Sequence, residues 1–361
     1  MKLEEKRTIL FGVLNWGLGH ATRSVPVIEA LLKQGFNVVL ASDGEALRFL
    51  RNRFTDLAYG ELPAYNIRYA KGKNSLLRLV WQLPKIVAVK RKEHQQLQKL
   101  IRLHNAIGVI SDNRLGFYSK KLPSVYISHQ LSMVSPIPWA GVKKIHHRVI
   151  SKFDACWVPD FEERSVSLAG DISHSNKPKV PLYFLGPLSR YSGRINTSQK
   201  KYKVLAVLSG PEPQRSLLAK KLEEELLQLK VDAVLILGKA RTGTKQKEGL
   251  TIIDWADSEQ LLELMSQSEM VISRSGYSSI MDYYYLGKKA LLIPTLGQPE
   301  QEYLARWQMH CGRFAYVAQD KMDLPKNLKE AQRYSGFSKN ELPIEPNWEQ
   351  LFLLFKGKRE S

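Results

Sequence analysis

The sequence predicts an α/β fold built from two doubly wound parallel sheets, one in each half of the chain. In both halves, apolar runs of strand length alternate with helix-length segments, as is typical of parallel sheets covered by helices. The length of 361 residues exceeds the usual size of a single hydrophobic core. We therefore expect domains at 1–186 and 203–361, joined by a polar linker at 187–202.

The first half contains strand-like segments that end in polar residues. Strands are expected at residues 8–14, 36–41, 107–112, 124–130 and 155–160, and the last three of them end in hydrogen-bonding residues. The first is followed by a glycine-containing turn and an amphipathic helix over 21–34, with a stop signal at Gly35. Carboxyl ends of parallel strands meet at one sheet edge, where ligands bind in open α/β folds. The pattern therefore predicts a polar cleft at that edge.

His20 stands where the first turn enters its helix. A histidine at a helix N-terminus tends to stay neutral, which suits a general base near pH 7. The alternative is a histidine that only caps or packs. Asp112 or His129 could polarise His20 if their strands are neighbours, a point that the sequence leaves open.

The second half repeats the alternation. Strands are expected at 204–208, 233–238, 250–253, 270–272 and 290–294, with helices over 214–230 and 259–265. An apolar patch over 348–355 predicts a terminal helix, which we expect to be able to pack back on the first domain.

The segment 273–282, Ser-Arg-Ser-Gly-Tyr-Ser-Ser-Ile-Met-Asp, joins a strand to a helix. Its small residues, hydroxyls and arginine gather at a helix N-terminus, where unpaired N–H groups and the helix dipole attract anions. This composition predicts a phosphate site. The alternative is an ordinary capped helix in an α/β domain.

Composition and charge narrow the functional classes. Two distant cysteines, no secretory signal and no apolar run of about 20 residues favour a cytoplasmic protein. The net charge is +19, and residues 1–190 hold 29 Lys and Arg against 14 Asp and Glu. Such an imbalance favours an anionic partner for the first half.

The most basic stretch, residues 67–103, interleaves its charges with Leu, Val and Trp. That mixture suits an anionic membrane surface better than nucleic acid, for which we expect no specific binding. Amphipathic helices with solvated basic faces are an equally good interpretation. Pro84 is expected to break or kink this segment.

Taken together, the chain resembles the GT-B nucleotide-sugar glycosyltransferases, specifically family 28. The resemblance reaches to about residue 317 and is strongest from Ile272 through Asp282, continuing with Gly287, Pro294 and Glu300-Gln301. It implies two Rossmann-like domains facing a central cleft, and a hexosyltransferase that uses a UDP-sugar, such as UDP-N-acetylglucosamine, with inversion. No cofactor or obligatory metal is implied. The partners implied are a UDP-sugar and an unidentified acceptor, which a lipid-linked molecule on the inner face of the plasma membrane would satisfy.

The resemblance also assigns roles to residues. It implies a diphosphate site at Arg274, Ser275, Gly276 and Ser278, with Ser209, Gly210 and Arg190 beside it. Asp282 would accept ribose hydroxyls, Glu300 and Gln301 would contact the sugar, and Trp255 would lie against the uracil. On the acceptor side stand Gly17, Gly19, His129 and Gln130, with His20 as base and Asp112 as its helper. Asp282 replaces the family's usual Glu, and His129 replaces an acid. The sequence leaves two rival functions open, a UDP-sugar 2-epimerase and a non-catalytic nucleotide-sugar-binding protein.

Overall fold

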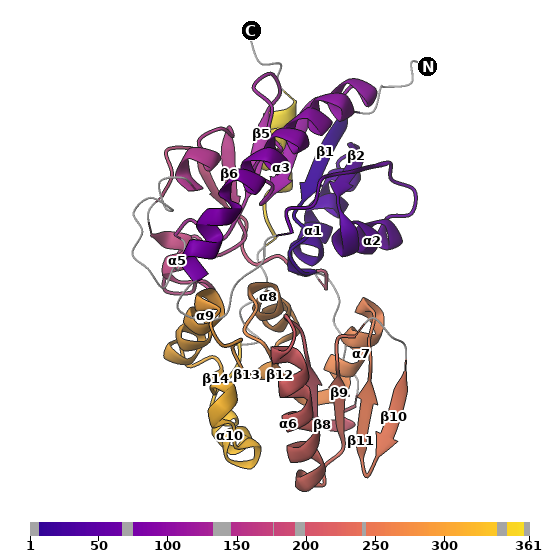
Figure 1. Ribbon diagram of the computed structural model, residues 1–361, viewed down its shortest axis with the longest axis vertical. Coiled ribbons are helices and arrows are strands. Elements are labelled where there is room, and N and C mark those ends of the chain that lie inside the picture. The colour runs from indigo at the N-terminus through magenta and orange to yellow at the C-terminus, as the bar shows by residue number, and fades with distance from the viewer. Residues whose placement is uncertain are drawn as a thin grey trace.

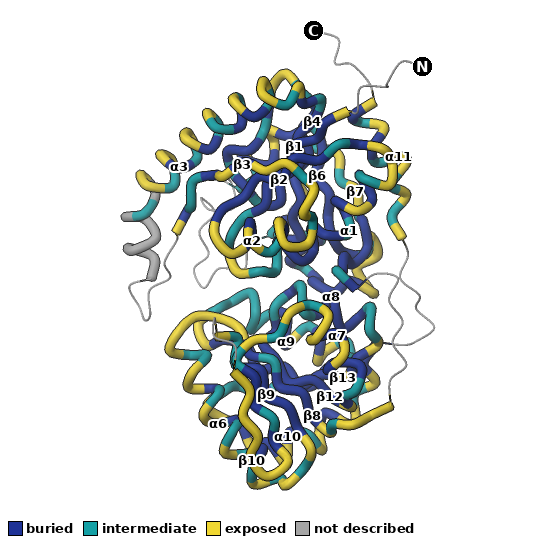
Figure 2. Tube along the Cα trace, turned by 90° about the vertical axis from the view of Figure 1, so that its right-hand side faces the viewer, coloured by how far each residue is buried: buried dark blue, intermediate teal, exposed yellow. Residues whose placement is uncertain are grey.

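The protein forms two lobes stacked along its long axis (Figure 1). The computed structural model describes residues 7–66, 75–132, 146–175, 177–191, 199–239, 243–337 and 345–356, apart from the side chains of 75–81 and 83. Each lobe is built on one seven-stranded sheet. Buried residues follow the strands through the interior of both lobes (Figure 2). The predicted pair of doubly wound domains is confirmed.

The N-terminal sheet is entirely parallel, in the order β3-β2-β1-β4-β5-β6-β7. Its strands are β1 (Thr8–Val13), β2 (Asn37–Ser42), β3 (Tyr59–Glu61), β4 (Gly108–Asp112), β5 (Ser124–Ile127), β6 (Ala155–Val158) and β7 (Leu182–Phe184). The described helices of this domain are α1 (Gly19–Lys33), α2 (Gly44–Arg53), α3 (Ser75–Leu103) and α5 (Asp171–His174). Strands β1, β4 and β5 are neighbours, so their carboxyl ends lie side by side.

The C-terminal sheet has the order β10-β11-β9-β8-β12-β13-β14, with only β10 antiparallel among its described strands. The strands are β8 (Tyr202–Val207), β9 (Ala233–Ile236), β10 (Thr244–Lys247), β11 (Leu250–Ile253), β12 (Ser268–Ser273), β13 (Lys289–Leu292) and β14 (Ala315–Tyr316). The helices are α6 (Gln214–Leu229), α7 (Ser258–Gln267), α8 (Tyr277–Leu286), α9 (Pro299–His310) and α10 (Leu324–Ala331), with a 3-10 turn at Gln319–Lys321.

The last described segment belongs to the N-terminal lobe. Helix α11 (Trp348–Phe352) and the 3-10 turn Leu353–Phe355 lie against that lobe (Figure 2). The ring of Phe352 packs edge-on against Phe36 with centroids 5.8 Å apart, and lies 6.0 Å from Trp157. The chain therefore returns across the molecule to complete the core of its first domain.

The structure departs from the sequence-based expectation at short elements. Strands β3, β10 and β14 have two to four residues each, too few to show an apolar pattern. Strand β7 extends the first sheet with a segment for which no strand was expected. Helix α3 runs unbroken through Pro84, so the expected break is wrong. Pro84 is exposed, and a proline in a helix removes a single backbone N–H donor.

One side of the domain interface is held by hydrogen bonds from α9 to a loop of the N-terminal domain. Trp307 Nε1 donates to the Ser167 carbonyl at 3.0 Å, and Gln308 Nε2 donates to the Leu168 carbonyl at 2.6 Å. The Tyr303 hydroxyl accepts from the backbone N–H of the first residue of α5 at 2.8 Å. These bonds hold α9 against the N-terminal domain.

Within the described ranges, no helix combines the length and the apolar character needed to cross a membrane.

Candidate active site

Three loops converge at the carboxyl edge of the N-terminal sheet. His20 begins the first turn of α1 after β1, Asp112 ends β4, and His129 follows β5. Strand pairing places Asp112 opposite Val13 on one side and Ile127 on the other. The strands that precede or carry His20, Asp112 and His129 are therefore neighbours, which the sequence alone could not establish.

His20 and Asp112 form a hydrogen-bonded pair. His20 Nδ1 lies 2.7 Å from Asp112 Oδ1, and the carboxylate is completely buried while 14% of the His20 side chain is exposed. A carboxylate only accepts, so we assign the proton to Nδ1. The Nε2 atom then carries a lone pair, and no described residue is hydrogen-bonded to it. This is the arrangement of a general base oriented by a carboxylate.

Arg23, one turn along α1, binds the same carboxylate and was not singled out from the sequence. Its Nε donates to Asp112 Oδ2 at 2.7 Å and its Nη2 donates to Oδ1, which makes the contact bidentate. Its Nη1 lies 3.0 Å from His129 Nδ1. A sequence signal existed, because residues three apart on a helix share a face, but it identifies no partner.

Burial and this cluster of charges set the protonation states. Burial, followed by the positive charge of Arg23, lowers the pKa of His20 against the opposing effect of Asp112. Burial alone would raise the pKa of Asp112, but Arg23 and His20 hold it at about 2. Near neutral pH, His20 is thus neutral and Asp112 ionised.

The N-terminus of α8 faces this pair from the second domain. Gly276 occupies the cap position without a side-chain hydrogen bond to the helix, so the first N–H groups of α8 have no side-chain cap. A Cβ at Gly19 would lie 2.7 Å from Ser278 Oγ, which shows how closely the loop of the first domain approaches α8. Gly17, with φ of +69°, allows the turn that leads there. The uncapped N-terminus of α8 and the His20–Asp112 pair therefore lie close together.

Glu300, in the first turn of α9, crosses between the domains. Its Oε1 lies 2.9 Å from His129 Nε2, and its Oε2 accepts from Gln130 Nε2 at 2.5 Å. The ring of His129 also stacks on Tyr277 of α8, with centroids 4.0 Å apart. His129 and Gln130 therefore contact the C-terminal domain directly.

Arg274 and Asp282 both have hydrogen-bond partners inside the protein. The Arg274 guanidinium is buried and donates to the carbonyls of Ile293 and Pro294 at 3.1 and 3.2 Å. It also bonds Gln214 and Gln319, and thereby braces the loops around the second sheet's edge. Burial lowers its pKa to about 10.

Asp282 is buried against the expected linker. Its Oδ1 accepts from the Ser189 hydroxyl at 2.6 Å, and its Oδ2 lies 3.5 Å from Arg190 Nη2. Burial raises the pKa of Asp282. Arg190 also donates to Ser258 at 3.1 Å, so it joins the linker to the second domain.

The other residues that the resemblance assigns to the UDP-sugar differ in how far they are exposed to solvent. Ser209, Gly210 and Trp255 are exposed at strand ends, and 46% of the Trp255 surface is accessible. Ser275 is buried, and its hydroxyl donates to the Gln301 carbonyl at 2.7 Å. The Gln301 side chain accepts from the Thr295 N–H at 2.9 Å. Of these five residues, Ser209, Gly210 and Trp255 are exposed, Gln301 is half-buried and Ser275 is buried.

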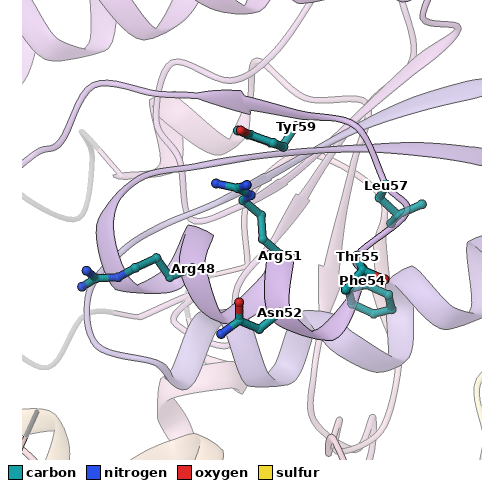
Figure 3. Close-up of a pocket in the computed structure, with 7 residues that line it drawn as sticks. All are labelled: Arg48, Arg51, Asn52, Phe54, Thr55, Leu57 and Tyr59. Carbon is teal, nitrogen blue, oxygen red and sulfur yellow. The ribbon is translucent and has the colours of Figure 1, made fainter. Parts of the chain in front are cut away.

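Other candidate sites are weaker. Among the described residues, no group of three or more His, Cys, Asp and Glu side chains is arranged to hold a metal. A hollow of about 370 Å³ lies between α2 and β3, where Arg51 stacks over Tyr59 (Figure 3). No predicted site residue lines it.

Comparison with known proteins decides the class of enzyme. Residues 7–134 match the model described as glycosyl transferase family 1, and residues 215–341 match the glycosyltransferase family 28 C-terminal domain. The chain is a GT-B glycosyltransferase, similar to family 28. His20 and Asp112 of the glycosyltransferase lie in the first match, and α8 and Glu300 lie in the second.

Individual relatives agree with this class. An uncharacterised glycosyltransferase of Methanosarcina acetivorans is 24% identical over 81% of each chain. The UDP-N-acetylglucosamine–N-acetylmuramyl-(pentapeptide) pyrophosphoryl-undecaprenol N-acetylglucosamine transferase of Sulfurihydrogenibium sp. is 28% identical over 34% of this chain and 36% of its own. The glycosyltransferase SnogD from Streptomyces nogalater shares the fold with a TM-score of 0.63 and 15% identity, over 97% of this chain and all of its own. The predicted resemblance and fold are confirmed.

The lowered pKa of His20 predicts the pH dependence of the glycosyltransferase. A base acts when it is unprotonated, so kcat/KM should fall as pH drops through the pKa of His20 in the free enzyme. We expect the midpoint of that fall below the ordinary histidine value of about 6.5. A pH profile of kcat/KM at constant ionic strength measures it. A midpoint above 6.5 would contradict the assignment.

Proposed function

We propose that this glycosyltransferase moves a hexose, with N-acetylglucosamine the first candidate, from a UDP-sugar to an acceptor hydroxyl with inversion at the anomeric carbon. The observation that carries the proposal is the His20–Asp112 pair beside the uncapped N-terminus of α8. A base on one domain and an anion site on the other are the two parts that a single displacement needs. The partial identity to an N-acetylglucosamine transferase supports the choice of sugar.

The proposed reaction is a single displacement at the anomeric carbon. His20 Nε2 takes the proton of the acceptor hydroxyl, whose oxygen forms a bond to the anomeric carbon. The bond from that carbon to the diphosphate oxygen breaks, and UDP leaves with the electron pair. Asp112 stabilises the imidazolium that forms, as an orienting carboxylate does beside other catalytic histidines.

The donor side is proposed to neutralise the leaving group. The first N–H groups of α8, with Gly276 and Ser278, would bind the diphosphate as fixed dipoles in the cleft. Ser209 and Gly210 would form a second backbone contact, and Trp255 would stack on the uracil. Glu300 and Gln301 would contact the sugar, and no obligatory metal is proposed.

Direct ligand roles for Arg190, Arg274, Ser275 and Asp282 require rearrangement of the contacts described above. In the proposal these residues support the donor loops.

The decisive experiment is a donor screen followed by product analysis. Thermal shift against UDP and a panel of UDP-sugars should show stabilisation by UDP-linked donors. Transfer to hydroxyl acceptors, including polyprenyl-diphosphate sugars, is then followed by UDP release, and proton NMR reads the anomeric configuration. Retention at the anomeric carbon would overturn the inverting mechanism.

The same assay separates the rival functions. Conversion of UDP-N-acetylglucosamine to its 2-epimer without acceptor would replace the transferase by an epimerase. Binding of UDP-sugar with neither transfer nor slow donor hydrolysis would indicate a binding protein instead.

A lipid-linked acceptor would place the enzyme at the inner face of the plasma membrane, and α3 offers the surface for that proposal. Lys85, Arg91 and Lys92 are exposed on α3, next to Val87, which is 47% exposed. Lys90 differs from these, because burial and the nearby Lys152 lower its pKa. An exposed basic helix with apolar residues is suited to anionic lipid.

We predict that the triple variant Lys85→Gln/Arg91→Gln/Lys92→Gln binds anionic vesicles about a hundredfold more weakly, because each charge contributes about 1 kcal/mol near such a surface. Sedimentation with vesicles of phosphatidylglycerol and phosphatidylcholine measures this. The matched control removes three exposed lysines of the second domain, Lys321, Lys326 and Lys329, and should bind nearly as wild type. Equal binding of wild type to purely neutral vesicles would refute the proposal.

A further inference from the structure

Arg23 occupies the centre of a chain of polar contacts that connects the two sides of the cleft. Its guanidinium is 3% exposed, and it holds both oxygens of Asp112. Through Nη1 it also reaches His129, whose other ring nitrogen lies against Glu300 of the second domain. The contacts thus run from Asp112 through Arg23 and His129 to Glu300.

The geometry requires an arginine at this position. A planar guanidinium has five N–H donors in a fixed fork, so it can bind a carboxylate bidentately and still donate sideways. A lysine would bring the same charge as a single point. Ser24 Oγ also lies within hydrogen-bond distance of Asp112 Oδ2, at 3.2 Å, but it carries no charge, and its other contact is the His20 carbonyl of the same helix, at 2.8 Å.

Arg23 also stands beside the base itself. Its Nη2 lies 2.9 Å from His20 Nδ1. The charged and titratable groups around His20 are Arg23 on the same helix, Asp112 on β4 and His129 after β5, with Tyr277 on α8 and Glu300 on α9 farther along the contacts. Of these groups, Arg23 is the only permanent cation. It therefore opposes protonation of His20 and complements the charge of Asp112.

We propose that Arg23 is the positioning residue of the catalytic pair: it fixes the Asp112 carboxylate, keeps His20 unprotonated and ties both to His129 and Glu300 at the donor side. The inference rests on His20 being the base of the proposed function. In this proposal the charge of Arg23 and the shape of its guanidinium have separate effects. Charge acts on the protonation of His20, and the fork acts on the alignment of Asp112.

The test compares Arg23→Lys and Arg23→Gln with Ser24→Ala as the matched control at the same carboxylate. The midpoint of His20 is followed by NMR titration of the histidine rings, with His20→Gln to assign its signal among the eight histidines. Circular dichroism reports whether each variant is folded, and kcat and kcat/KM for transfer are measured alongside. The titration needs no substrate, so it tests Arg23 even if no UDP-sugar is turned over.

Arg23→Gln should move the His20 midpoint to higher pH, because a cation that opposed protonation is gone. Arg23→Lys should keep the midpoint low but lose up to about a hundredfold in kcat, because one ammonium cannot hold both oxygens and His129. Ser24→Ala should leave the midpoint close to wild type. A folded Arg23→Gln that titrates as wild type would overturn the proposal. If Arg23→Gln does not fold, full activity of Arg23→Lys would overturn it.

Discussion

Replacing His20 by alanine should lower kcat for transfer by about 10²–10⁴-fold, the usual contribution of a positioned general base. The acceptor hydroxyl would then have to lose its proton to water. UDP binding should change little, because the proposed contacts to UDP belong to the second domain and His20 belongs to the first. Steady-state kinetics with saturating donor, together with calorimetric titration of UDP, separate the two effects.

The control for this variant is His310→Ala, which removes an exposed histidine at the end of α9. It should transfer sugar at the wild-type rate. If His20→Ala retained full kcat while His310→Ala behaved normally, another group would have to be the base, and the proposed mechanism would be wrong.

Replacing Asp112 by asparagine should affect both stability and catalysis. The carboxylate is buried between Arg23 and His20, and removing one partner of such a pair leaves the other charge uncompensated, at about 3–5 kcal/mol. The remaining folded enzyme should lose about 10³–10⁴-fold in kcat, because an amide neither orients the same tautomer nor stabilises the imidazolium. Urea denaturation and kinetics on the folded fraction measure the two losses.

The pH dependence gives the stability effect a second signature. The folded pKa of Asp112 is about 2, below the unfolded value of about 3.9. Its stabilising contribution is therefore complete above about pH 4 and is lost as pH falls toward 2. The wild type should lose its advantage over Asp112→Asn across that interval. Glu45→Gln, which removes an exposed pair with Arg48, should cost less than about 1 kcal/mol at any pH. An equal stability loss in the two variants would contradict the buried-pair account.

Much of the fold was predictable because long strands and helices repeat an apolar pattern. The position of His20 followed from the turn after the first strand, and Asp112 from a strand that ends in an acid. Their contact did not follow, because strand order is set by packing between distant segments, not by the local sequence. Short strands such as β14, with two residues, leave no pattern to detect.

The residues assigned to the UDP-sugar show a second limit of prediction from sequence. A motif indicates that Arg274 and Asp282 are near a ligand site, but it cannot tell whether their charges face the ligand or the protein. In the structure, Arg274 donates to the backbone carbonyls of residues 293, 294 and 214 and to the Gln319 side chain, and Asp282 accepts from Ser189 of the linker. Arg23 was missed for a related reason. An arginine within an amphipathic helix is ordinary until the fold shows a buried carboxylate opposite it.

The return of α11 to the first lobe has a consequence for the order of folding during synthesis. Phe352 and Phe355 pack on Phe36 and near Trp157, although some 300 residues separate Phe36 from Phe352 along the chain. The ribosome makes Phe352 and Phe355 only after the entire second domain. The first domain must therefore wait with an incomplete apolar surface, and the second domain, made later, can finish its own core sooner.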